Sequence, residues 1–235
     1  MNTLRLDWCS HEAAKYAVER WYSRPDMPVG KLAKIGVWED GIFIGALIFG
    51  CGTGGVQKIG EKLGAGKFGT AELSRIAMGK HSASVSRIIR IALMLLTRAQ
   101  PGLRLIVTYA DPSAGHHGGV YQAGGWIYCG KSSKDFMYRD AAGVEHHSRQ
   151  ASASGTKMSR GKLTHVIKTG DCVKIPLEPK HRYLMPLDAD MRAKVELLRQ
   201  PNPKQCVRSI PAETAAVQAE EGGPAPTRTL HPSLR

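Results

Sequence analysis

The stretch from Leu103 to Gly130 constrains the fold more than any other part of the chain. It begins with an apolar run, Leu105–Tyr109, that has the composition of a buried β-strand. A polar turn at 110–119 follows, then a short helical segment at 120–123 and an aromatic strand at 126–128. The turn contains one carboxylate, one hydroxyl, two imidazoles and three glycines. Because turns fixed to strand ends concentrate binding and catalytic groups, this unit predicts an active site.

The elements on either side complete the predicted fold. Ser10 is a suitable N-cap for the first helix, and Asp40-Gly41 is a typical hairpin turn between two strands. The expected elements outside the central stretch are a helix at 12–22, strands at 34–39, 42–49 and 70–78, a long helix at 84–99, a strand at 182–187 and a helix at 189–198. This order predicts an α/β (α+β) domain over residues 1–200. It resembles the acyltransferase fold of the GNAT superfamily, whose central mixed, mainly antiparallel sheet is flanked by helices.

The strand at 70–78 precedes the long helix and is expected to border the active site. A regular two-residue period would divide its side chains between two faces. That period places Glu72, Ser74 and Met78 on one face and Leu73, Arg75 and Ala77 on the other.

Three segments carry weaker signals. Residues 50–69 are rich in glycine but lack the order of a phosphate-binding loop, so we expect a flexible loop there, either a mobile lid or polyanion-contacting loop or an ordinary disordered loop. Residues 150–160 are small, polar and basic, which indicates another loop. From residue 201 to 235, prolines, alanines and mixed charges predict a disordered tail.

The net charge of +13 favours a polyanionic partner, with a merely basic enzyme as the alternative. Five scattered cysteines without a CxxC pair indicate reduced thiols. The N-terminus lacks a signal peptide, and no apolar run is long enough to cross a bilayer. We therefore expect a soluble intracellular protein that does not bind a membrane.

Several motifs are similar to those of the phage Mom family. They are WYSRP at 21–25, IGVWEDGIFIGALIFGCG at 35–52, ELSRIAM at 72–78, VSRIIRIALMLL at 85–96, ADPSAGHHGGVYQAGGWIYCG at 110–130 and KHRYLMPLD at 180–188. The resemblance covers residues 10 to 200. It implies a transferase in the host cell cytoplasm that converts adenine in double-stranded phage DNA to N6-carbamoylmethyladenine. That modification protects the DNA from host restriction enzymes. Whether the protein forms a homodimer is left open.

The candidate catalytic residues follow from this chemistry, because a stacked, paired adenine must be extruded and its N6 proton removed. Asp111 is the first choice for a general base or for orienting the amine. The other candidates are His116 for acid–base work, Tyr22 and Tyr121 for stacking or proton donation, and Ser74 and Arg75 at the cleft. Arg75 either holds an anionic group or pairs with Glu72.

Further residues are candidates for binding the substrate or the donor: Ser23, Arg24, Ser84, Ser86, Ser113, Gly115, Trp126 and Tyr128. Asp111, His116 and His117 together have the composition of a two-histidine, one-carboxylate iron site. A structural turn capped by Asp111, with solvated histidines, is the alternative.

The acyl donor is left open. Typical GNAT enzymes carry glycines after the fourth strand that let the backbone approach the coenzyme A pyrophosphate. The corresponding run at 78–86, MGKHSASVS, lacks the close-approach glycines. Acetyl-CoA and glycyl-tRNA are both candidates, and the second would make tRNA a partner.

Two other functions remain alternatives. One is an ordinary N-acetyltransferase that acts on a protein or a small amine. The other is a non-catalytic, basic DNA-binding protein that keeps a degenerate acyltransferase fold.

Overall fold

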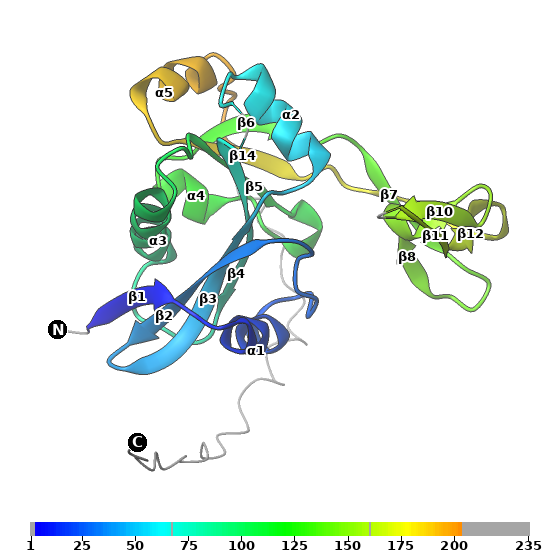
Figure 1. The fold of residues 1–235 in the computed structure, drawn as a ribbon, viewed down its shortest axis with the longest axis horizontal. Helices are drawn as coiled ribbons and strands as arrows, with labels where there is room; N and C mark the ends of the chain where they lie inside the picture. The colour runs from blue at the N-terminus through cyan, green and yellow to red at the C-terminus, as the bar shows by residue number, and fades with distance from the viewer. Residues whose placement is uncertain (1–2, 67, 160, 204–235) are drawn as a thin grey trace, which may run out of the picture. The chain divides into compact units, whose positions relative to one another are not determined.

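The computed structural model describes residues 3–66, 68–159 and 161–203. A seven-stranded sheet has the order β1-β2-β3-β4-β5-β14-β6 (Figure 1). Its strands are β1 (Leu4–Trp8), β2 (Leu32–Glu39), β3 (Ile42–Gly50), β4 (Thr70–Met78), β5 (Leu105–Ala110), β14 (His181–Pro186) and β6 (Ile127–Lys131). All neighbours are antiparallel except β4 and β5. The predicted α/β class with a mixed, mainly antiparallel sheet is therefore confirmed, although β1 was not predicted.

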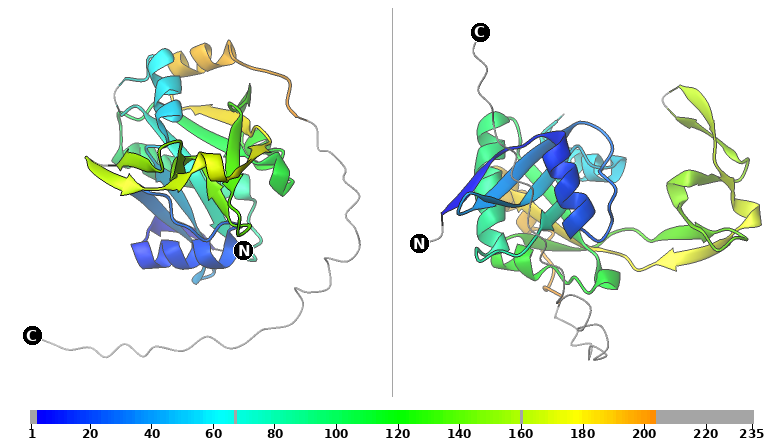
Figure 2. Two further views of the ribbon diagram at one scale, coloured as in Figure 1. Left: turned by 90° about the vertical axis from the view of Figure 1, so that its right-hand side faces the viewer. Right: turned by 90° about the horizontal axis from the view of Figure 1, so that it is seen from below.

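In the described part of the chain, five α-helices flank the sheet; Figures 1 and 2 show their arrangement. They are α1 (His11–Trp21), α2 (Gly54–Lys62), α3 (Val85–Ala99), α4 (Gly119–Ala123) and α5 (Ala189–Glu196). One apolar cluster joins α3 and α4 to one face of the sheet. Two other clusters lie on the opposite face, one beneath α1 and one beneath α2 and α5. Alternate residues of β5 enter the two sides, because Ile106 packs beneath α3 while Leu105 and Val107 pack beneath α2 and α5.

Two of the predicted loops contain regular structure. Within 50–69 the chain forms helix α2, so the expectation of a flexible loop is wrong there. Val56 is fully buried, and Gly60 lies so close to Thr70 of β4 that a Cβ atom would overlap its side chain. Tertiary packing has therefore outweighed the low helix propensity of glycine. The predicted loop at 150–160 likewise contains two short strands, β9 (Ala151–Ser152) and β10 (Thr156–Ser159).

Strand β4 contains a β-bulge at Ser74. Ile48 of β3 pairs with Arg75, and the next residue, Phe49, pairs with Leu73, so Ser74 has no partner across the ladder. The extra residue reverses the alternation beyond it. Leu73 packs in the cluster beneath α3, whereas Ala77 packs beneath α1. The expectation that these two residues share a face is wrong for this reason.

The parallel strands β4 and β5 stop pairing just before the bulge. Pairing runs from Thr70–Leu105 to Glu72–Val107 and ends there, although both strands continue. In place of the next ladder bond, the Thr108 hydroxyl donates to the carbonyl oxygen of Leu73 at 3.0 Å. The sheet therefore opens between the second halves of β4 and β5.

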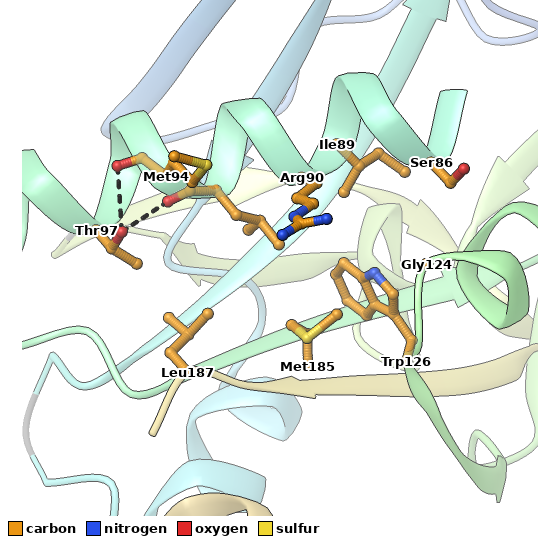
Figure 3. A pocket seen from close by; sticks show the side chains of 10 residues that line it. Ser86, Ile89, Arg90, Met94, Thr97, Gly124, Trp126, Met185 and Leu187 are labelled. Atoms are coloured by element: carbon orange, nitrogen blue, oxygen red, sulfur yellow. Dashed lines mark hydrogen bonds between the residues drawn. The ribbon is translucent and has the colours of Figure 1, made fainter. Parts of the chain in front are cut away.

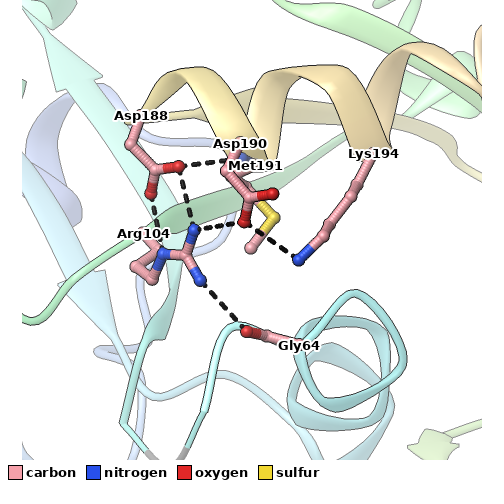
Figure 4. Close-up of polar contacts among 6 residues, drawn as sticks. All are labelled: Gly64, Arg104, Asp188, Asp190, Met191 and Lys194. Atoms are coloured by element: carbon pink, nitrogen blue, oxygen red, sulfur yellow. Dashed lines mark hydrogen bonds and ion pairs between the residues drawn. The ribbon is translucent and has the colours of Figure 1, made fainter.

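An ion-pair network fixes the other end of β5 (Figure 4). The guanidinium of Arg104 donates to Asp188 at 2.7 and 2.9 Å and to Asp190 at 2.7 Å. It also donates to the Gly64 carbonyl at 3.2 Å. Because Asp188 caps α5 by accepting from the Met191 amide, one side chain joins β5, α5 and the turn after α2.

A long segment, 132–180, separates β6 from β14. It contains β7 (Asp135–Arg139), β8 (Glu145–His147), β9, β10, β11 (Lys162–His165), β12 (Ile167–Lys168) and β13 (Val173–Leu177) in small separate sheets. Strands β7 and β8 pair antiparallel as a hairpin. Within the described residues, no helix has the length and apolar character needed to cross a bilayer. The predicted tail falls on 204–235, outside the described residues, apart from its first few positions.

Candidate active site

Asp111 lies directly after β5 and receives four contacts. Its Oδ1 accepts hydrogen bonds from the Ser113 hydroxyl at 2.6 Å and the Ser113 amide at 3.1 Å. Its Oδ2 lies 3.0 Å from Lys180 Nζ and 4.0 Å from the Arg24 guanidinium. Partial burial alone would raise the pKa of Asp111, but the bonds from Ser113 and Lys180 outweigh it and lower that pKa. The carboxylate is therefore ionised at neutral pH, and this suits it to orient an amine more than to take its proton.

A buried phenol lies at the point where β4 and β5 separate. Tyr121 on α4 is almost fully buried, and its hydroxyl oxygen lies 3.1 Å from the Thr108 hydroxyl. Because Thr108 donates its only proton to Leu73, the proton between the two hydroxyls is that of Tyr121. Burial raises the pKa of Tyr121 to about 12. The phenol therefore stays neutral, and rotation of its O–H away from Thr108 would let it donate a hydrogen bond to a developing negative charge.

Arg75 and Tyr22 meet on the α1 side of the opening. The Arg75 guanidinium lies over the Tyr22 ring, 4.8 Å from its centroid, and donates to the Ser74 carbonyl at 2.9 Å. Arg75 Nε is buried without a partner in the described part of the chain. Tyr22 is close enough to Tyr121 to contribute to the raised pKa of that phenol. The two predicted tyrosines are therefore brought to one place, with a guanidinium beside them.

The turn after Asp111 is hydrogen-bonded to Tyr183 of β14. The Tyr183 hydroxyl donates to the His117 carbonyl at 2.6 Å and accepts from the Gln122 amide at 2.9 Å. Gly118 has φ of +85°, and a Cβ atom there would overlap the Tyr183 ring. Gly115 also has positive φ, +75°, but faces open space. Glycine is required at 118 by both conformation and space.

The predicted iron site is not formed. In the part of the chain that the structure describes, no three His, Cys, Asp or Glu side chains lie close enough together to hold a metal ion. The His116 side chain is exposed and has no hydrogen-bond partner among the described residues. Asp111, His116 and His117 therefore do not form such a group among the described residues. This hypothesis is therefore not supported.

Two of the predicted binding residues line a cavity of about 300 Å³ between α3, the turn from α4 to β6, and β14 (Figure 3). They are Ser86 and Trp126, and Arg90 also lines the cavity, with its guanidinium drawn on the side of the indole. Trp126 is buried against Tyr121, with ring centroids 5.3 Å apart. Its role in the fold is thus to support the phenol.

The other predicted binding residues lie apart from the cavity. Ser23 follows α1 in a bend next to Arg24. Tyr128 is buried in β6, with its hydroxyl 3.2 Å from His181 Nδ1. Ser84 is the N-cap of α3, but its side chain makes no capping hydrogen bond.

The loop before α3 is occupied by a carboxylate of the chain itself. Glu39 accepts from the Ser82 hydroxyl at 2.6 Å, the Ser82 amide at 2.9 Å and the Ala83 amide at 3.1 Å. The bonds from Ser82 lower the pKa of Glu39. Its negative charge is stabilised where a helix N-terminus favours anions.

The profile of the Mom protein family matches residues 3–204, which is most of the chain. The chain belongs to the Mom protein family. No curated protein matches it.

Solved structures similar to this Mom family member include the following acyltransferases. An acetyltransferase from Bacillus subtilis in complex with CoA has 12% identity and a TM-score of 0.44, covering 80% of this chain and 100% of its own. An N-acyl amino acid synthase from uncultured soil microbes has 14% identity and a TM-score of 0.44, covering 83% and 94%. An IAA acetyltransferase from Bacillus cereus has 14% identity and a TM-score of 0.42, covering 79% and 100%.

Sequence reasoning missed three site residues: Thr108, Lys180 and Tyr183. A signal existed for the last two, because Lys180 begins the KHRYLMPLD motif and Tyr183 lies in its predicted strand. That strand pairs with β5, placing Tyr183 opposite Thr108 and His181 opposite Ala110. Lys180 thus reaches Asp111 through strand pairing that the sequence did not reveal.

Proposed function

We propose that the protein is a DNA-modification transferase that converts adenine in duplex DNA to N6-carbamoylmethyladenine. Membership of the Mom family is the single observation that carries this proposal. The opening between β4 and β5, with an ionised carboxylate and a neutral phenol at its margin, supports it. The surplus of basic residues fits a phosphate-rich substrate.

The roles proposed for the side chains follow from their charge states. An extruded adenine would donate from its N6 amine to Asp111, whose cationic neighbours Arg24 and Lys180 hold the carboxylate in place. Arg75 and Tyr22 would contact the base or an anionic group beside it. Tyr121 would stabilise the oxyanion that forms when the amine attacks the donor carbonyl.

The donor we favour is glycyl-tRNA. Attack by N6 on the glycyl ester would release the tRNA hydroxyl and leave a glycyl amide on N6. The free glycyl amine would then attack ring carbon 6 through a five-membered spiro intermediate, and cleavage of the original bond from carbon 6 to N6 gives the carbamoylmethyl product. The Glu39 carboxylate supports this choice, because it occupies the amides before α3 and would repel the pyrophosphate of acetyl-CoA. Modification by purified protein with acetyl-CoA and no tRNA would contradict it.

The test is mass spectrometry of nucleosides from plasmid DNA of cells that express the protein. Wild type should give a deoxyadenosine heavier by one carbamoylmethyl group. Asp111→Asn should lower its yield about 100-fold or more. Asp7→Asn, which changes an exposed carboxylate on β1, is the matched control and should retain full yield.

Unmodified DNA from well-expressed wild type would refute the proposal. Acetylation of a protein or small amine would then favour the N-acetyltransferase alternative. DNA protection that survives Asp111→Asn without any modified base would favour the non-catalytic DNA-binding protein.

A further inference from the structure

Strands β10 (Thr156–Ser159) and β11 (Lys162–His165) form a two-stranded ribbon within the long segment between β6 and β14. Strands β10 and β11 pair antiparallel, and Met158 lies directly opposite Leu163. Lys157 and Lys162 each lie one position away from this pair, so alternation places both lysines on the other face of the ribbon. The ribbon therefore has one apolar face and one basic face near its turn.

The apolar pair is exposed. Met158 keeps 65% of its surface accessible and Leu163 keeps 64%. Single exposed apolar side chains are common, but a cross-strand pair at the end of a ribbon is a ready contact surface. Nothing in the described part of the chain buries this pair.

The local charge identifies the kind of partner. Residues 146–170 contain five Lys or Arg and no Asp or Glu. A cationic stretch of this kind is complementary to a phosphate backbone. A two-stranded β-ribbon also has the width that a DNA groove admits.

The base of the segment contacts the candidate active site. Lys180, its last residue, lies 3.0 Å from Asp111, and the Ser132 amide donates to the Lys180 carbonyl at 2.8 Å. A duplex bound by this segment would therefore be bound by the same segment whose last residue, Lys180, contacts Asp111.

We propose that the β10–β11 ribbon binds duplex DNA and that Met158 and Leu163 insert between adjacent base pairs. Proteins that bend or open DNA use apolar wedges of this kind to unstack a base step, while basic groups hold the neighbouring phosphates. Unstacking beside the target lowers the cost of extruding an adenine. The inference rests on the proposed function, because it assumes that duplex DNA is the substrate.

The test compares three forms of the full chain: wild type, Met158→Ser/Leu163→Ser, and the matched control Val144→Ser/Val173→Ser. The control residues are exposed valines of the same segment. Each form is titrated, by fluorescence anisotropy, against a matched duplex and a duplex with one mismatched base pair. A 2-aminopurine in the matched duplex reports unstacking.

We expect the Met158/Leu163 variant to bind the matched duplex about tenfold more weakly and to lose the 2-aminopurine signal. The mismatched duplex is already unstacked, so it should restore most of the affinity. The valine control should behave as wild type. As a second measurement, Lys162→Gln should weaken binding to both duplexes. It should also reduce the slope of log K against log salt concentration by about one, the value of one phosphate contact.

Equal binding and equal 2-aminopurine signal in all forms would overturn the ribbon proposal while leaving the proposed function intact. If wild type binds no duplex and yields no modified nucleoside, the proposed function fails as well. A wild-type dimer that becomes monomeric in the Met158/Leu163 variant, measured by light scattering, would assign the pair to a second copy of the chain. Loss of binding to anionic vesicles alone would assign it to a membrane surface, and either assignment would overturn the proposal.

Discussion

Gly118→Ala tests whether the turn after Asp111 is fixed by close packing. Alanine at φ of +85° costs about 1 kcal/mol, because its Cβ crowds the neighbouring carbonyl in the left-handed region. The new methyl would also overlap the Tyr183 ring, which is fully buried and is tied by its hydroxyl to His117 and Gln122. Overpacking of this kind costs about 1–3 kcal/mol. The total, about 2–4 kcal/mol, is a large share of the 5–15 kcal/mol that is typical of a folded domain.

The measurement is urea unfolding of the full chain, followed by nucleoside mass spectrometry of plasmid DNA. Gly115→Ala is the matched control, since it has nearly the same φ but no atom within 4 Å of the added methyl. It should cost about 1 kcal/mol or less, which leaves the Tyr183 overlap as the difference between the variants. If Gly118→Ala is no more destabilising than Gly115→Ala, the close packing of the turn against β14 is refuted.

Three further changes have defined outcomes. Tyr121→Phe removes the hydrogen bond to Thr108 and should cost about 1 kcal/mol in urea unfolding while abolishing most modification; full activity would exclude the phenol from the chemistry. Asp188→Asn should lower the stability at pH 7 by weakening the ion pair with Arg104, while the asparagine oxygen can still cap α5. Because Arg104 lowers the pKa of Asp188 to about 2, the wild-type advantage should persist above pH 4 and disappear as pH falls towards 2; an unchanged difference at pH 2 would contradict this. Glu39→Gln should lower the Tm at pH 7, and the difference from wild type should shrink as pH falls below the ordinary glutamate pKa. Equal Tm values at pH 7 would refute the role of Glu39 in anchoring the loop before α3.

Local signals in the sequence were sufficient for much of the fold. Ser10 caps α1 through the Ala13 amide, as its position before an amphipathic run predicted. Asp40 and Gly41 both have positive φ, which is what the hairpin signal requires. Asp111 accepts from Ser113, the short-range bond that a carboxylate beside a turn forms.

The features that sequence reasoning missed depend on contacts between distant residues. The bulge at Ser74 exists only in the register of β4 against β3, so no count along one strand reveals it. Helix α2 is stabilised by packing on β4, against the weak helix propensity of its glycines. Lys180 lies 69 positions from Asp111 in the chain, and only the pairing of β14 with β5 brings them together.

The junction of β6 and β14 has a consequence for how this chain can vary. Lys131 and His181 lie opposite each other in the sheet, so the ends of segment 132–180 meet whatever lies between them. Each doubling of a flexible loop adds only about 0.6 kcal/mol to the cost of closing it. The part of the segment between Ser132 and Lys180, which hydrogen-bond to each other, can therefore be exchanged without disturbing the register of the seven-stranded sheet or the contact of Lys180 with Asp111. Insertions and deletions within it alter the surface offered to a partner and leave the separation of β4 and β5 unchanged.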